Sequence, residues 1–194
     1  MSFIEEYDAL VKERATLGIP PLALSVEQTK ALCELLKTSD DEFLATLLEE
    51  RVNPGVDDAA LVKCEFLDQI LKGQIKAPKI DKKRALKMLE TMLGGYNVKV
   101  LIEALKDETL AKEAADVLKN IIFIHDDFHT IAELSQTNAY AKEILQSWAN
   151  AEWFLKKEKL PEVIKCIVFK VAGETNTDDL SPAGDAFTRS DIPL

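Results

Sequence analysis

The sequence predicts a mainly α-helical fold, a stack of antiparallel helix pairs followed by a short C-terminal segment that contains β structure. Three observations support this prediction. Leucine, alanine, lysine and glutamate, which favour helices, dominate the 194 residues, and only 7% of the chain is aromatic. Apolar residues recur at helical spacing, between cap signals, from residue 3 to residue 155. The density of β-branched residues rises after Pro161.

The first part of the chain carries helix-start and helix-stop signals in regular order. Apolar residues at helical spacing predict a helix over residues 3–17, which the following glycine and proline pair end. Ser25 with Gln28 fits a capping box and predicts the start of a second helix. Ser39 with Glu42 repeats this signal and predicts a third helix.

The same signals continue through the middle of the chain. A fourth helix is expected from about Asp57 to Lys72, with Gly73 where a C-terminal glycine cap belongs. Asp81 is the expected N-cap of the next helix, which the glycine pair at 94–95 ends.

Residues 98–122 show the most regular pattern. A short helix over 98–105 is expected to pair with a helix over 110–122, with Asp107 in the turn between them. The string LIEALKDETLAKEAADVLKN resembles a HEAT repeat, in which small alanines let paired helices approach and leucines fill the space between layers. A run of short helices around it favours a HEAT-like α-solenoid stack.

A last helix is expected over residues 139–155, and it carries both tryptophans, Trp148 and Trp153. A core or docking face explains these aromatic residues, and an exposed partner site is the alternative. A charged linker follows, so we divide the chain into a helical domain, residues 1–157, and a second unit, residues 158–194. The apolar run Val163–Val171 predicts a buried strand in that second unit.

Charge and composition exclude several classes of protein. The net charge of −10 disfavours general binding to nucleic acids or anionic membranes, and the basic run Lys82–Arg84 is interpreted as a solvated first turn of a helix. Cys33, Cys64 and Cys166 are widely spaced among apolar neighbours, which predicts buried, reduced thiols in a cytoplasmic protein. The N-terminus lacks the apolar stretch of a signal peptide, and no apolar run approaches the roughly 18 residues of a membrane span.

The two histidines, His125 and His129, are spaced so that a helix would place both on one face, where Asp126 could add an oxygen ligand for a metal ion. The glutamate of the H-E-x-x-H motif is missing, so we interpret the group as a polar cluster at a helix end and predict no metal site.

The stretch Gly173–Pro182 concentrates more polar chemistry than any other part of the chain. It places Asp178 and Asp179 side by side, an arrangement that needs donors or a cation if both carboxylates are buried in the ionised form. Arg189 lies downstream and could hold a substrate carboxylate through two parallel hydrogen bonds. A salt bridge on a surface loop is the simpler interpretation of these residues.

The C-terminal string VFKVAGETNTDDLSPAGDAFTRSDIPL resembles the start of the swivel domain in the bacterial aconitase B family. The strings LGGYNVKVLIEAL, YAKEILQSWANAEWFLKK and FIEEYDALVKERATLGIPPLALSVEQTKALCELL also resemble the N-terminal region of that family, so the resemblance spans all 194 residues. It implies a HEAT-like domain over residues 1–157 and a swivel domain that starts in residues 158–194.

The resemblance also implies a function for the full-length protein. By this resemblance the full-length protein is expected to be an aconitate hydratase, a lyase of the tricarboxylic acid cycle. Such an enzyme interconverts citrate and isocitrate through cis-aconitate and also hydrates 2-methyl-cis-aconitate. The family uses a [4Fe-4S] cluster whose ligands lie outside this chain, so no cluster role passes to its cysteines. Arg189 matches a substrate-binding position, and Asp178, Asp179 and Ser181 match the active-site loop. By itself the chain is expected to catalyse nothing.

Two hypotheses follow for the helical part. The first makes it a component of the enzyme. The second makes it a protein–protein interaction or dimerisation module with no enzymatic role of its own. The resemblance implies a homodimer or protein partner through the helical domain and mRNA binding by the cluster-free full-length protein, although the acidic charge gives RNA binding no support.

Overall fold

The computed structural model describes residues 3–18, 21–55, 57–93, 95–121, 123–156, 159–168, 170, 173–174 and 176. These residues form a mainly α-helical structure, as predicted. The helices in the described residues are α1 (Phe3–Thr16), α2 (Val26–Leu36), α3 (Glu42–Glu50), α4 (Asp58–Leu71), α5 (Lys82–Glu90), α6 (Tyr96–Ala104), α7 (Ala111–Leu118), α8 (Asp127–Leu134), α9 (Ala139–Ala149) and α10 (Glu152–Leu155).

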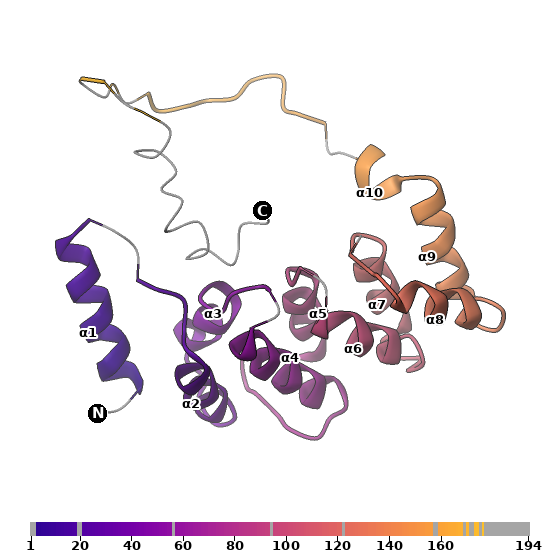
Figure 1. Ribbon diagram of the computed structural model, residues 1–194, viewed down its shortest axis with the longest axis horizontal. Coiled ribbons are helices and arrows are strands. Elements are labelled where there is room, and N and C mark those ends of the chain that lie inside the picture. Colours follow the sequence, from indigo (N-terminus) through magenta and orange to yellow (C-terminus); the bar gives the residue numbers. More distant parts are fainter. Residues whose placement is uncertain are drawn as a thin grey trace.

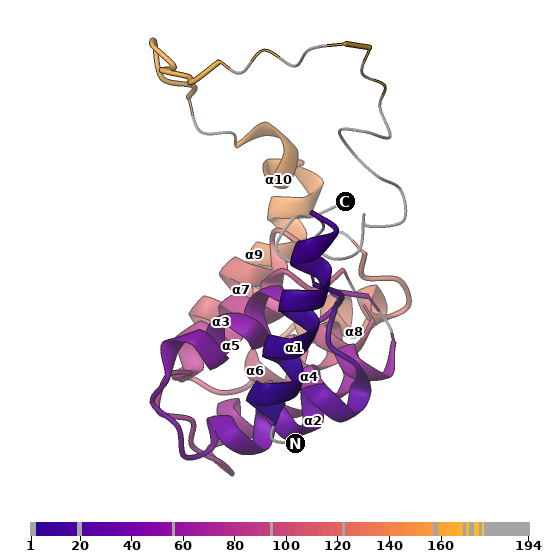
Figure 2. The same cartoon turned by 90° about the vertical axis from the view of Figure 1, so that its left-hand side faces the viewer.

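The helices pack in two rows that run along the molecule (Figure 1). In one row α2, α4, α6 and α8 contact each other in succession, and in the other α5, α7 and α9 do so. The rows are joined where α4 packs on α5, α6 on α7 and α8 on α9. Seen from the α1 end, α1 lies in front of this array, while α10 and residues 159–168 extend away from it (Figure 2).

The local signals place most helix starts correctly. Ser25 caps α2 with a complete capping box, because Gln28 N–H donates to Ser25 Oγ at 3.2 Å and Ser25 N–H donates to Gln28 Oε1 at 3.0 Å. Helix α3 is a correction: its cap is Asp41, not Ser39, and Asp41 accepts from the Phe43 N–H at 2.9 Å. Ser39 instead accepts from the Asp41 N–H, which fixes the turn before the cap.

The stop signal after α4 is also confirmed. Gly73 has a φ of +69°, in the left-handed region that glycine adopts without steric cost, and its N–H donates to the Ile70 carbonyl at 3.0 Å.

Three expectations about the C-terminal half are wrong in the described residues. The expected single helix over 139–155 is two helices, because Ala151 adopts a left-handed backbone with φ of +51° between α9 and α10. Helix α8 was missed, and of its eight residues only Ile131 is buried. The expected buried strand is not formed over residues 163–168, whose side chains are exposed. A strand needs a neighbouring strand for its backbone hydrogen bonds, and none pairs with these residues in the described part of the chain.

At several helix ends, side chains of a later helix donate hydrogen bonds to the terminal carbonyl groups. Asn97 Nδ2 donates to the Leu89 and Met92 carbonyls, at 2.8 and 3.1 Å, where α5 ends. Asn138 Nδ2 donates to the Leu105 carbonyl after α6 at 3.0 Å. Because the last carbonyls of a helix lack partners within the helix, these contacts join each helix end to its neighbour.

Helices α3 and α4 are joined by a buried cation. Lys63 on α4 is 1% exposed, and its Nζ donates to the carbonyl of Glu49 at 3.1 Å. Burial lowers the pKa of Lys63 to about 8, and the nearby negative charge of Glu49 offsets only part of this effect. Burial also raises the pKa of the Cys33 and Cys64 thiols to about 12, so both neighbours stay uncharged in the range where Lys63 titrates.

The buried Lys63 predicts a pH dependence of stability. In the folded state its pKa is about 8 against an ordinary value of 10.5, so the folded state binds fewer protons between these values. The free energy of unfolding should therefore rise with pH from about 8 to 10.5, by on the order of 3 kcal/mol from this group. Denaturant unfolding of the unmodified protein and of Lys63→Met across this range measures the difference. The advantage of the variant should be largest at pH 7 and shrink towards pH 10.5.

A pH-independent difference between these two proteins would show that Lys63 titrates alike in the folded and unfolded states. Lys99→Met on α6 is the matched control, because Lys99 is exposed.

Candidate functional site

The residues predicted to bind substrate or to line the active-site loop, which are Asp178, Asp179, Ser181 and Arg189, lie outside the described residues. Their roles therefore stay predictions.

The two histidines do not share a helix face. His125 lies two residues before α8 and has a left-handed backbone with φ of +50°, whereas His129 is inside α8. The His125 ring lies against Phe123 with centroids 6.5 Å apart, and the His129 ring lies against Phe128 at 5.9 Å. Within the described ranges no group of three or more His, Cys, Asp or Glu side chains is arranged to hold a metal ion.

The cysteines divide into two kinds. Cys33 and Cys64 are buried, as predicted, and their raised pKa values keep them as thiols. Cys166 is exposed, which corrects the prediction of a third buried thiol. The reason is that the apolar run around it has no sheet to pack against in the described structure.

The most distinctive surface of the described structure is aromatic. We define the aromatic surface as Phe123, Phe128, Trp148, Trp153, Phe154 and Leu155. Trp148 is half-buried, and the exposed fractions of the other five range from 41% for Trp153 to 68% for Leu155. The core interpretation of the last helix is therefore wrong for Trp153 and Phe154. Phe123 and Phe128 were missed, and their only sequence signal is that two phenylalanines flank a polar turn.

The aromatic rings are arranged around a cavity. Phe128 stacks on Trp148 with centroids 6.3 Å apart and an interplanar angle of 29°, and Trp153 meets Phe154 edge to face at 5.6 Å. A cavity of about 270 Å³ lies between Ile124, Phe128, Trp148 and Trp153. Offset and edge-to-face pairs are favourable geometries for aromatic rings. The cavity and rings together can accept apolar side chains.

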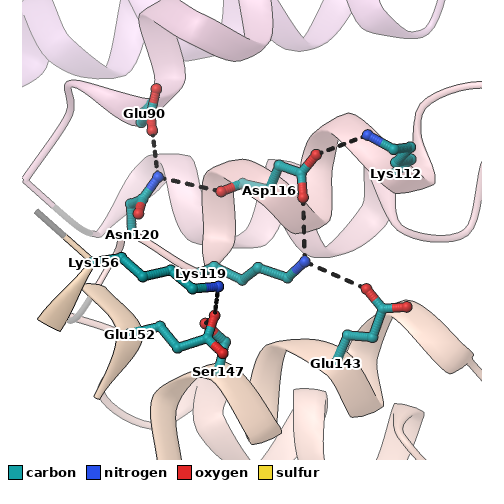
Figure 3. A network of polar contacts seen from close by, with 9 residues as sticks. All are labelled: Glu90, Lys112, Asp116, Lys119, Asn120, Glu143, Ser147, Glu152 and Lys156. Carbon is teal, nitrogen blue, oxygen red and sulfur yellow. Dashed lines mark hydrogen bonds and ion pairs between the residues drawn. The ribbon is translucent and has the colours of Figure 1, made fainter. Parts of the chain in front are cut away.

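A polar network connects α9, the helix that carries Trp148, to α7 and α5 (Figure 3). Lys119 Nζ on α7 lies between Asp116, at 3.2 Å, and Glu143 of α9, at 3.3 Å. Asn120 donates to Glu90 of α5 at 2.8 Å, so α5, α7 and α9 are linked in sequence.

Helix α10 is attached to α9 by a separate group of polar contacts (Figure 3). Glu152 Oε2 accepts from Lys156 Nζ at 2.6 Å and from Ser147 Oγ at 3.1 Å. These donors lower the pKa of the Glu152 carboxyl, with Lys156 the larger cause. The Glu152–Ser147 contact therefore links α10 to the C-terminal end of α9.

A second hollow lies between α4, α6 and the turn before α8, and it shares the lining residue Ile124 with the aromatic cavity. Its volume is about 500 Å³, and its charged lining consists of Glu65, Asp68, Lys99, Asp126 and Asp127, together with His125.

In the described structure no helix is long and apolar enough to cross a bilayer.

These features define a class of protein before any relative is considered: a helical scaffold whose described part presents an exposed aromatic surface. Residues 6–154 match the family model described as the Aconitate B N-terminal domain, and residues 166–194 match the model described as the Aconitate hydratase 2 N-terminus. The chain belongs to the aconitase B family, which confirms the resemblance.

The similarity to curated relatives extends over nearly the whole chain. Aconitate hydratase B is 53% identical over 196 aligned positions in Helicobacter pylori, 52% over 195 in Pseudomonas aeruginosa and 50% over 195 in Escherichia coli. These alignments cover 98–99% of this chain but only 22–23% of the relatives. The chain thus spans less than a quarter of their length and corresponds to their N-terminal part.

Trp148 has a second contact that predicts a measurable effect. Its Nε1–H donates to the Leu118 carbonyl of α7 at 3.2 Å. Trp148→Phe keeps a ring against Phe128 but loses this bond and some buried area, so the free energy of unfolding should fall by about 1–2 kcal/mol. Urea unfolding followed by circular dichroism measures this loss. Trp153→Phe is the control, and it should change stability by less than about 0.5 kcal/mol because Trp153 is 41% exposed. Equal losses in both variants would contradict a structural role for the Trp148 bond.

Proposed function

We propose that the full-length protein is an aconitate hydratase that interconverts citrate and isocitrate through cis-aconitate, in the tricarboxylic acid cycle, and that it also hydrates 2-methyl-cis-aconitate. The observation that carries this proposal is the identity of at least 50% to relatives named aconitate hydratase B over 98–99% of the chain. The residues of this chain alone form no complete catalytic site in this proposal, so the isolated chain is inactive.

The substrate contact proposed for this chain is Arg189. A guanidinium group can hold a carboxylate through two parallel hydrogen bonds, and each substrate of the proposed reaction carries three carboxylates. Asp178, Asp179 and Ser181 support the loop that borders the same cleft. Their side chains accept and donate the hydrogen bonds that fix such a loop, and none needs to exchange a proton with substrate.

The cofactor of the proposed reaction is a [4Fe-4S] cluster, which would act as a Lewis acid on the substrate hydroxyl when bound. The cysteines of the described structure do not suit it. Cluster ligands are thiolates, whereas Cys33 and Cys64 are buried thiols with pKa values near 12, and Cys166 is a single exposed residue. We therefore place the ligands in parts of the full-length protein outside this chain.

We further propose that residues 1–157 form a HEAT-like solenoid and that residues 158–194 begin a swivel domain in which the run Val163–Val171 finds partner strands. The two packed rows of helices support the first statement, and the separate family match of residues 166–194 supports the second. A cytoplasmic location accords with three unpaired cysteines. A homodimer through the helical domain, and mRNA binding by the cluster-free protein, remain secondary proposals.

The Arg189 proposal predicts a kinetic change in the full-length, cluster-loaded protein. Arg189→Lys keeps the positive charge but loses the planar pair of donors, so the KM for citrate should rise and kcat should fall. The rate of cis-aconitate formation, followed by its ultraviolet absorbance, measures both. The cluster absorbance and the Tm should stay unchanged, which separates a substrate contact from a folding defect. Kinetics equal to those of the unmodified enzyme would remove Arg189 from the site.

A second candidate function is a helical interaction module with no enzymatic role of its own, and the aromatic surface is the observation that favours it. The activity assay on the full-length protein separates the two candidates, because an interaction module would show no cis-aconitate formation even with its cluster loaded.

A further inference from the structure

The exposed apolar side chains of the described residues are unevenly distributed. Ten of the fifteen large hydrophobic residues that are exposed lie between residues 123 and 168. They form two groups, the exposed members of the aromatic surface and five aliphatic residues, which are Leu160, Val163, Ile164, Ile167 and Val168. Exposed apolar side chains that are concentrated in this way favour an interaction site over ordinary protein surface.

The two ends of the helical array differ in the polarity of their exposed side chains. At the N-terminal end α1 covers α2, buries Phe3 and Tyr7, and turns acidic residues outward. Stacked helical structures need such polar end helices for solubility. At the other end α10 has no buried residue and presents Trp153 and Leu155 to solvent. The C-terminal end of the array therefore exposes more large apolar side chains than α1, whose exposed one is Ile4.

The chain itself indicates what covers this end. More than three quarters of the length of these relatives lies outside the matched N-terminal part, and the exposed aliphatic group begins at Leu160, five residues after α10. Five extended residues reach roughly 17 Å, so a domain that starts there is held close to the aromatic surface. Such tethering raises the effective concentration of a partner to the order of millimolar, which favours a contact within one chain.

We propose that the aromatic surface is the docking site for the domain that begins in residues 158–194 of the same polypeptide, and that this contact sets the position of that domain on the helical scaffold. The proposal rests on the proposed function only in taking the full-length protein to continue as its relatives do. The apolar cavity between Phe128, Trp148 and Trp153 receives an aliphatic side chain of that domain. The Glu152–Lys156 and Glu152–Ser147 contacts hold α10 so that the chain leaves beside the cavity.

Hydrogen exchange of the purified full-length protein tests this docking through α10. A four-residue helix frays by itself, so slow exchange of residues 152–156 requires a cover. We expect these amides to be protected in the unmodified protein and to exchange roughly tenfold faster in Phe123→Ser, whose substitution lies in the surface but outside the measured peptide. The matched control is Phe43→Ser on α3, because Phe43 is 49% exposed and Phe123 is 51% exposed. Trp153→Ser provides a second variant from within the cavity.

The radius of gyration from small-angle X-ray scattering separates undocking from a local effect on α10. It should increase in Phe123→Ser and Trp153→Ser and stay unchanged in Phe43→Ser. Rapid exchange of residues 152–156 in the unmodified protein would overturn the proposal. Protection that disappears on dilution, together with a dimer in sedimentation, would assign the surface to a second copy and also overturn it. Protected α10 amides in a protein without aconitase activity would defeat the proposed function and leave the docking proposal standing.

Discussion

The described fold depends on how short helices satisfy the carbonyl groups at their C-terminal ends. Helices of eight to fourteen residues, such as α4 and α7, leave a large share of their carbonyls without a partner inside the helix. In this structure a side chain from a later helix donates to several of them: Lys63 to α3, Asn97 to α5, Asn138 to the turn after α6 and Trp148 to α7. Each contact fixes the end of one helix against a helix that follows it in the chain, either the next one or a later one.

The identity of each donor reflects its surroundings. Asn97 is fully buried but neutral, so its burial avoids the free-energy cost of a buried charge. Lys63 is a buried amine, and the cost of burying its charged form is the reason that its pKa is lowered. The longer side chain of Trp148 reaches from α9 to the Leu118 carbonyl, and its ring is part of the aromatic surface. One residue therefore contributes both to the fold and to the aromatic surface. Arg84 of α5 binds Glu42 and Glu49 of α3, a partly buried contact that aligns these two helices from the side.

Local signals allowed much of this fold to be predicted, because a cap or a glycine stop acts within four residues. Ser25 with Gln28 and Gly73 are examples that the structure confirms. Apart from the cap of α3, which is Asp41 rather than Ser39, the errors arose where distant parts of the chain decide the outcome. The break at Ala151 follows no glycine or proline, and Trp148 reaches a carbonyl thirty residues away. A run such as Val163–Val168 reads as a strand, yet whether it is one depends on neighbours that the sequence of this segment does not contain. Arg189 could be proposed only through a family resemblance, since one arginine in a polar tail has no pattern of its own.

The asymmetry between the two ends of the array connects the fold to the proposed enzyme. A free-standing helical module would gain solubility from a polar helix at each end, and α1 shows that this chain can build one. An apolar end lowers solubility unless another surface covers it. A domain that is tethered at Leu160 can cover this end without having to bind from solution. If that domain also carries Arg189, the aromatic surface helps to determine where the guanidinium lies relative to the remaining catalytic groups. The helical domain then contributes to catalysis by position alone, because orientation of a bound substrate is sensitive to displacements of about 1 Å.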